Sequence, residues 1–280
     1  MSIAYYNGKI CEIGEVAIPL SDRAVFFGDG IYDAAIGRGG VIYLEDEHID
    51  RFVGNAGKMG IPLPFGKEEL RSLLRELASR SGEECFFIYF QLTRYSQERR
   101  HACRERERSN LLITVTPAAL PDPKRQITLV SYPDRRYGYC HIKTLNLLPA
   151  VLASSYAEGM GADEAVFYRG GTVTECAHSN ISIIKGGTLI THPTDRRILP
   201  GITRAKMIGI CREMGMAVAE RPFTRRELAG ADAVLVSSSS KLCLTAASID
   251  GVPIRVRARE LADGICRTFF EDFMAKTGEK

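Results

Sequence analysis

The residue best suited to covalent chemistry is Lys143, in the run CHIKTLNLL at residues 140–148. The run is mostly uncharged and leads into a predicted helix, so the amine would lose part of its solvation. Poor solvation favours the neutral amine, and a neutral amine can attack a carbonyl carbon. Because most lysines lie at the surface, a solvated lysine at a strand end is the competing interpretation of this segment alone.

A second segment, ILPGITR at residues 198–204, could bind an anion. Gly201 precedes a predicted helix, whose first N–H groups have no partner within the helix and whose dipole favours negative charge. This arrangement suits a phosphate monoester. Ser237–Ser240 follow a predicted strand and offer hydroxyl donors for the same ligand. An ordinary helix start and a polar loop are the alternatives here.

Glu175, in TVTECAHSN at residues 172–180, is a lone acid between two strand-like segments. A carboxylate at this place could hold a proton on a ring nitrogen. Taken alone, Glu175 could equally be a solvated turn residue.

A run rich in arginine covers residues 98–108. Such runs are most often solvated loops. Acids cancel part of its charge and no nucleic-acid-binding motif accompanies it, so a nucleic-acid partner is not expected. Arg99 and His101 could instead bind a substrate carboxylate, which arginine grips through two parallel hydrogen bonds. The sequence leaves open the role of three further arginines, Arg104, Arg106 and Arg108.

The composition excludes several other classes of protein. The 280 residues are 45% hydrophobic and 25% charged, with a net charge of +3, which is typical of a globular protein without a preference for polyanions. The five histidines and eight cysteines match no metal-binding pattern, so no metal is expected.

The cysteines form no C-x-x-C pair and no secretory leader is evident, so we expect reduced thiols in a cytoplasmic protein. No apolar run is long enough to span a bilayer. The pair of glycines at 28 and 30 lacks the third glycine of a dinucleotide fingerprint.

Hydrophobic periodicity predicts a mixed α/β (α+β) chain. Asn-Gly at residues 7–8 predicts a hairpin across residues 5–10, because both residues tolerate positive φ. Further strands are expected at 30–36, 41–44, 85–95, 110–117, 126–132, 164–168, 180–184, 188–191, 216–220 and 232–236. Helices are expected at 45–59, 67–80, 148–158, 203–214 and 258–275.

Three prolines in the span TPAALPDPK, at residues 116–124, predict a domain boundary. We expect a smaller N-terminal domain at residues 1–118, a proline-rich linker at 119–125 and a larger C-terminal domain at 126–280.

Taken together, these segments resemble the fold-type IV aminotransferases, which depend on pyridoxal 5′-phosphate. The matches follow the family order along nearly the whole chain, and five in order are much stronger evidence than one. They are SDRAVFFGDGIY at 21–32, EHIDRF at 47–52, IKTLN at 142–146, TE and SN within 174–180, and LPGITR at 199–204.

The resemblance implies a fold of two α/β domains with the cofactor in the cleft between them, and a homodimer. It implies that Lys143 holds pyridoxal phosphate as a Schiff base and then carries a proton between the substrate Cα and the cofactor. Glu175 would pair with the pyridine N–H, and Leu199 would lie against the ring. The phosphate would be bound by Arg51, Gly201, Ile202 and Thr203, with a serine such as Ser238 or Ser239.

Within the family, Arg99 and His101 fit the R-x-H element of the D-amino-acid aminotransferases, and Tyr32 fits the tyrosine that works with it. In the family this loop crosses the dimer interface. Branched-chain aminotransferases usually carry F/Y-E-G-x-R from the Tyr32 position, whereas this chain has YDAAI at 32–36. His141 and residues 176–178 depart from the family pattern near the substrate pocket.

These residues favour transamination between a D-alanine-like D-amino acid and a 2-oxo acid. A branched-chain L-amino-acid aminotransferase and a 4-amino-4-deoxychorismate lyase of the same fold are the alternatives. A binding protein that kept the scaffold without catalysis is the alternative from a different class. In each case the expected partners are small molecules, with neither a membrane nor a nucleic acid.

Overall fold

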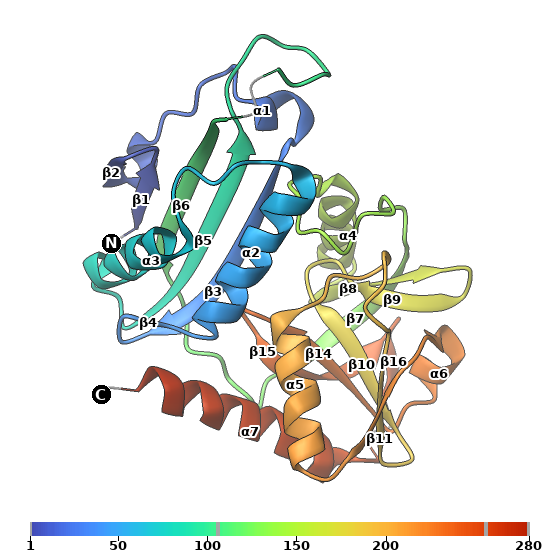
Figure 1. The fold of residues 1–280 in the computed structure, drawn as a ribbon. Helices are drawn as coiled ribbons and strands as arrows, with labels where there is room; N and C mark the ends of the chain where they lie inside the picture. Colours follow the sequence, from blue (N-terminus) through green and yellow to red (C-terminus); the bar gives the residue numbers. More distant parts are fainter. Residues whose placement is uncertain (1, 105–106, 255–256, 279–280) are drawn as a thin grey trace. The chain divides into compact units, whose positions relative to one another are not determined.

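The computed structural model describes residues 2–104, 107–254 and 257–278. The chain forms two compact units, each built on one β-sheet (Figure 1). The first unit holds Met1–Leu120, Ile142–Asn146 and Phe273–Lys280, and the second holds Pro121–His141 and Leu147–Asp272. The segment that carries Lys143 therefore groups with the first unit. The linear domain limits expected from the sequence stay a prediction.

The first unit is a six-stranded sheet in the order β2-β1-β6-β5-β3-β4, in which every neighbouring pair is antiparallel. Asn7 and Gly8 join the first two strands with φ of 46° and 95°, as a tight hairpin turn requires, so the predicted hairpin is confirmed. The elements of this unit are β1 (Ile3–Tyr6), β2 (Lys9–Glu12), a 3-10 turn (Ile13–Glu15), α1 (Arg23–Phe27), β3 (Gly30–Arg38), β4 (Val41–Ile42), α2 (Glu45–Met59), α3 (Lys67–Ser81), β5 (Cys85–Arg94) and β6 (Ser109–Pro117).

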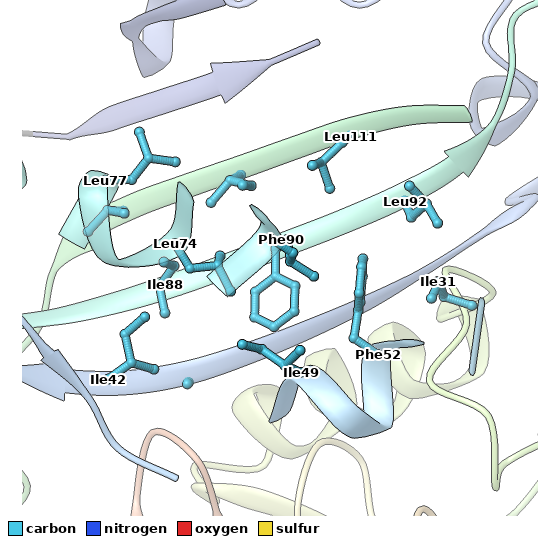
Figure 2. Close-up of a cluster of buried hydrophobic side chains, with 14 of the residues drawn as sticks. Ile31, Ile42, Ile49, Phe52, Leu74, Leu77, Ile88, Phe90, Leu92 and Leu111 are labelled. Carbon is cyan, nitrogen blue, oxygen red and sulfur yellow. The ribbon is translucent and has the colours of Figure 1, made fainter. Parts of the chain in front are cut away.

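One face of this sheet packs against α2 and α3 (Figure 2). Alternation along β5 turns Ile88, Phe90 and Leu92 toward the helices, and α2 meets them with Ile49 and Phe52. The Phe52 and Phe90 rings meet edge to face, with centroids 4.8 Å apart. Truncating one such ring costs about 3–5 kcal/mol. This core fixes the position of β3, which carries the candidate site residue Tyr32.

The second unit is a ten-stranded mixed sheet in the order β12-β11-β10-β14-β15-β7-β8-β9-β13, with β16 paired to β15. Strands β10 and β14 are buried on both faces, which explains their nearly continuous apolar sequences. The elements are β7 (Gln126–Pro133), α4 (Leu148–Gly159), β8 (Glu164–Arg169), β9 (Thr172–Cys176), β10 (Asn180–Lys185), β11 (Thr188–Thr191), α5 (Ile202–Glu213), β12 (Ala217–Glu220), β13 (Phe223–Thr224), α6 (Arg225–Ala229), β14 (Ala233–Ser238), β15 (Leu242–Ile249), β16 (Val252–Pro253) and most of α7 (Arg259–Thr277). The end of α7, from Phe273 onward, groups with the first unit.

The predicted mixed α/β class is confirmed, and the strands and helices expected from periodicity appear with ends shifted by at most two residues. The main strand that periodicity missed is β15, whose sequence LCLTAASI has little β-branched or aromatic character. It forms because it pairs with β14 on one side and β7 on the other. The short helix α1 was also missed, although Asp22 caps it by accepting a 2.8 Å hydrogen bond from the Ala24 N–H.

Candidate active site

The backbone of the Lys143 segment is bound to the beginning of β3. The Tyr32 N–H donates to the Lys143 carbonyl at 2.9 Å, and the Leu145 N–H donates to the Gly30 carbonyl at 3.1 Å. Ile31 and Thr144 pair as an isolated β-bridge. The segment therefore behaves as a short extra strand, and the position of Lys143 is set by a sheet rather than by a free loop.

Two glycines allow this close approach. A Cβ on Gly30 would lie 2.7 Å from both the Leu145 Cδ1 and the Leu92 carbonyl oxygen. Gly28 ends α1 with φ of 59°, and its carbonyl accepts a 3.0 Å hydrogen bond from the Asn146 side chain. The glycine pair that resembled half of a dinucleotide fingerprint thus has a structural role, because it seats the lysine segment.

The Lys143 amine lies over the Tyr32 ring, with Nζ 4.3 Å from the ring centroid. Tyr32 in turn stacks on Tyr89, with centroids 5.4 Å apart. Desolvation by burial raises the pKa of the Tyr89 hydroxyl, which donates to Gln91 and stays neutral. Two sequence-predicted site residues, Lys143 and Tyr32, are therefore brought together on a platform of aromatic rings.

Arg51 lies in a buried network on α2 and β3. Its guanidinium donates through Nε and Nη2 to the two oxygens of Asp33, both at 2.8 Å. The Nδ1 of His48 lies 2.7 Å from the same carboxylate, which is wholly buried. Burial opposes ionisation of Asp33, yet Arg51 and His48 outweigh it and hold the pKa of this carboxyl well below its usual range. A guanidinium carries five N–H groups, so this pairing leaves the predicted phosphate role of Arg51 open.

The Arg99–His101 loop packs against α1. The Arg99 guanidinium lies 5.4 Å from the centroid of the Phe27 ring, and the His101 ring lies 5.3 Å from it. Arg23, which is buried and paired with Asp29 at 2.7 Å, donates to the carbonyl of His101 at 2.9 Å. Both Arg99 and His101 are exposed. In the described part of the first unit, their ring contacts are with α1 and not with Tyr32.

The three further arginines stay unassigned. Arg108 lies over the Tyr95 ring at 4.0 Å, and the backbone N–H of Arg104 donates to Gln97. Arg106 lies outside the described residues.

Glu175 is the last residue but one of β9 in the second unit and is 5% exposed. Its Oε2 accepts hydrogen bonds from the Asn180 side chain and from the Leu199 N–H, each at 3.0 Å. Its Oε1 accepts from Nη1 of Arg136. The alternative of a solvated turn residue is therefore wrong, since this carboxylate is buried and both its oxygens are engaged. The sequence analysis did not single out Arg136, because it is one of several charged residues that follow β7 and belongs to no motif.

The turn at Gly201 lies beside the paired strands β10 and β14 of the second unit. The Asn180 side chain donates to the Leu199 carbonyl at 3.1 Å, and a Cβ on Gly201 would lie 1.9 Å from its Oδ1. Helix α5 starts at Ile202, directly after this glycine. Asn180 is paired with Ser237 across the two strands, which places the serine run beside the helix N-terminus.

The donors near this turn fit a phosphate. The first N–H groups of α5 have no acceptor within the helix. The Ser237 Oγ is buried and, within the described chain, has no hydrogen-bond partner. Thr203 and Ser238 are buried close to the same end, and Ser239 is half-buried. A buried unpaired hydroxyl is costly, and a bound anion would satisfy it. The donors at this turn of the second unit thus fit the phosphate group of pyridoxal phosphate.

Other kinds of site are not evident in the described residues 2–104, 107–254 and 257–278. Among them, no three histidine, cysteine or acidic side chains cluster in a way that could hold a metal. No helix in these ranges is both long and apolar enough to cross a membrane. All eight cysteines are free thiols.

Comparison with known proteins agrees with this geometry. The profile of the amino-transferase class IV family matches residues 30–249. D-alanine aminotransferase of Listeria monocytogenes serotype 1/2a (strain 10403S) is 36% identical over 253 residues, which is 89% of this chain and 88% of the relative. The branched-chain aminotransferase of T.th., solved with pyridoxamine 5′-phosphate, superposes with a TM-score of 0.88 at 20% identity, covering 99% and 95% of the two chains. A Legionella pneumophila protein assigned as 4-amino-4-deoxychorismate lyase gives 0.84 at 24% identity, covering 92% and 96%.

The fold and these matches define a pyridoxal-5′-phosphate-dependent transaminase. Within that class, the chain belongs to the amino-transferase class IV family. The resemblance stated from the sequence is therefore confirmed, as are the fold class, the enzyme class and the cofactor.

Proposed function

We propose that this transaminase transfers the amino group of D-alanine or a similar D-amino acid to a 2-oxo acid. The observation that supports this best is the 36% identity to D-alanine aminotransferase over most of both chains. The branched-chain and lyase neighbours are only 20–24% identical to this chain, so they support the fold but do not indicate the substrate. Residues 32–36, which differ from the branched-chain pattern, point the same way.

Each residue of the proposed site has a distinct task. Pyridoxal phosphate, when bound, supplies an aldehyde carbon and a ring that accepts electrons. Lys143 would bind that carbon, and its amine would move a proton to or from the substrate Cα. Glu175 holds the proton on the ring nitrogen, and Leu199 packs against the ring. The phosphate is bound by Arg51, Gly201, Ile202, Thr203, Ser238 and Ser239.

Tyr32, Arg99 and His101 are proposed to bind the substrate carboxylate. A guanidinium and an imidazole are the groups that recognise a carboxylate through charge-assisted hydrogen bonds. Because Arg99 and His101 are exposed and pack on α1, we infer that the loop acts in the site of a second copy of the chain.

A homodimer is also supported by an apolar face of α4. Leu148, Val151 and Leu152 lie at helical spacing and are 67%, 54% and 54% exposed. Contiguous exposed apolar side chains mark interaction sites on proteins that are otherwise polar at the surface. Light scattering should give twice the mass of the chain, and Val151→Lys should lower it. A monomeric wild type with full activity would contradict the dimer.

The function is tested with purified holoenzyme and 2-oxoglutarate as acceptor, supplied with D-alanine, L-alanine, D-leucine or L-leucine. We expect pyruvate from D-alanine and little turnover of either L-enantiomer. Turnover of L-leucine alone would support the branched-chain reaction. Release of 4-aminobenzoate from aminodeoxychorismate, without transamination, would support the lyase reaction.

Cross-subunit use of the Arg99 loop has its own test. The variants Lys143→Ala and Arg99→Ala should each be nearly inactive as homodimers. Mixed after mild dissociation, they should regain activity, because a heterodimer contains one site with both residues intact. Failure to regain activity, with heterodimers demonstrated by mass spectrometry, would place Arg99 in the site of its own chain.

A further inference from the structure

Arg136 joins two acids inside the second unit. Its Nε and Nη2 donate to the two oxygens of Asp134, each at 3.0 Å, and its Nη1 donates to Glu175. The guanidinium lies over the Phe167 ring, with Cζ 4.4 Å from the centroid, and the side chain is only 13% exposed. Every edge of the planar group is thus occupied, which fixes its orientation.

The orientation of Arg136 is itself held by neighbours. The Arg197 carbonyl accepts from Nη2 at 3.0 Å. Asp134 also accepts from the Arg136 N–H at 3.1 Å and from the Thr174 hydroxyl at 3.1 Å, and it pairs with Arg169 at 3.3 Å. Because Asp134 is anchored by these donors, Arg136 cannot follow Glu175 if that side chain moves. Arg136 therefore stays in place, and it is the Glu175 carboxylate whose position is held.

We propose that Arg136 is a positioning residue that acts through Glu175, by keeping this carboxylate ionised and aimed at the cofactor ring nitrogen. This inference rests on the proposed role of Glu175. A buried carboxylate that loses the cation beside it is driven toward its neutral form. A neutral acid cannot hold a second proton on the ring nitrogen, so the ring would lose its capacity to accept electrons.

The surroundings of Glu175 support this assignment of charge. The titratable groups around it include Arg136, Asp134 behind the guanidinium, and the thiols of Cys140 and Cys176. Burial raises the pKa of both thiols, so they are uncharged at and below neutral pH. Arg169 is paired with Asp134. Arg136 is the cation that contacts the Glu175 carboxylate directly.

The test compares Arg136→Met, Arg136→Lys and Glu175→Gln as holoenzymes. In R136M we expect kcat to fall about 10–100-fold and the acid limb of the kcat–pH profile to move to higher pH by about one unit or more, with KM nearly unchanged. R136K should lie between R136M and wild type, because an ammonium cannot bridge both acids in parallel. The absorbance of the bound cofactor should titrate with the same shifted midpoint.

Arg225→Met is the matched control. Arg225 also lies over an aromatic ring, 4.4 Å from the centroid of Tyr168, and pairs with an acid, Asp250. Its loss should leave the pH profile of the enzyme as in wild type. An R136M enzyme with a lower melting temperature but an unshifted acid limb would overturn the proposal and leave Arg136 a purely structural residue. If R136M does not fold, an unshifted acid limb of the kcat–pH profile in R136K would overturn the proposal instead.

A double variant separates this proposal from the proposed function. Once Glu175 is replaced by glutamine, adding R136M should have no further effect on kcat, because both changes act through one carboxylate. If E175Q alone keeps the kcat and pH profile of wild type, the assigned role of Glu175 is wrong. If E175Q is impaired and R136M is not, the role of Glu175 stands and the inference about Arg136 fails.

Discussion

Tyr32 holds Lys143 in two independent ways. Its backbone N–H donates to the Lys143 carbonyl at 2.9 Å, and its ring lies beneath the amine at 4.3 Å. The first contact depends on no side chain at position 32, whereas the second requires an aromatic ring. Substitutions of Tyr32 can therefore separate the ring from the hydroxyl without dislodging the segment that carries the amine.

Tyr32→Phe keeps the ring and removes the hydroxyl. We expect unchanged cofactor binding and a loss of roughly 10–100-fold in kcat/KM for D-alanine, since a hydrogen bond to a charged group contributes about 1.5–3 kcal/mol. Tyr32→Ala should lower kcat/KM further and also weaken retention of the cofactor. Steady-state kinetics and cofactor release after gel filtration measure the two effects. Wild-type kcat/KM in Tyr32→Phe would show that the hydroxyl has no role, and equal losses in the two variants would show that the ring adds nothing beyond the hydroxyl.

Gly201→Ala should weaken cofactor binding. The new Cβ would lie 1.9 Å from the Asn180 Oδ1, and Asn180 holds both Glu175 and Leu199. Displacing it should cost about 1–3 kcal/mol, a loss of roughly 5–150-fold in affinity for pyridoxal phosphate. Fluorescence titration of the apoenzyme measures the affinity.

Gly209→Ala is the control in the same helix. Nothing lies within 4 Å of the Cβ that it would add, so this change should leave affinity as in wild type. It should also stabilise the protein by about 0.5–1 kcal/mol, because alanine favours helix. Normal affinity in G201A would mean that the turn adapts and that its glycine is not required for phosphate.

The elements that position these residues follow from local rules. Helices α2 and α3 were predictable because leucine, isoleucine and phenylalanine recur on one face, and the Asn7-Gly8 turn because both residues adopt positive φ. Strand β15 was not predictable in this way, since its alanine and serine residues are held by pairing with β14 and β7. The pairing with β7 joins segments far apart in the sequence and therefore leaves no local pattern.

The same contrast applies to the candidate site. Lys143 and Gly201 stood out because few residue types can do their chemistry or adopt their geometry. Arg136 and Asp33 did not, because an ion pair between residues 39 or 18 positions apart has no spacing rule. Their importance comes from burial and from their partners, which only the three-dimensional arrangement defines.

Asp33→Asn should destabilise the protein strongly and in a pH-dependent way. Arg51 and His48 hold the pKa of Asp33 below its value in the unfolded chain, so its stabilising effect is present above the unfolded pKa and is lost as the pH falls toward the folded one. Removing the charge leaves Arg51 buried beside a neutral amide, at a cost of about 3–5 kcal/mol near neutral pH.

The measurement is the free energy of urea unfolding of the apoenzymes at about pH 7 and about pH 3. The difference between wild type and D33N should shrink at the lower pH. Arg125→Met breaks an exposed ion pair with Asp163 and serves as the comparison, with an expected change below about 1 kcal/mol. A constant difference between wild type and D33N at both pH values would rule out the ionised form of Asp33 as the source of the stability.

Arg23→Met should impair substrate binding without affecting the cofactor. Arg23 pairs with Asp29 and donates to the carbonyls of Arg100 and His101, so its guanidinium holds the Arg99–His101 loop against α1. Without it the loop samples more conformations, and the cost of ordering it is taken from substrate binding. We expect KM for D-alanine to rise roughly tenfold, which corresponds to about 1.4 kcal/mol, while kcat and the affinity for pyridoxal phosphate change little.

Arg23→Lys should restore only part of the wild-type affinity for substrate, because an ammonium cannot reach Asp29 and two carbonyls at once as the guanidinium does. A fall in cofactor affinity with KM unchanged would instead connect Arg23 to the Lys143 segment through Gly28, and would remove the argument that this arginine orders the Arg99–His101 loop.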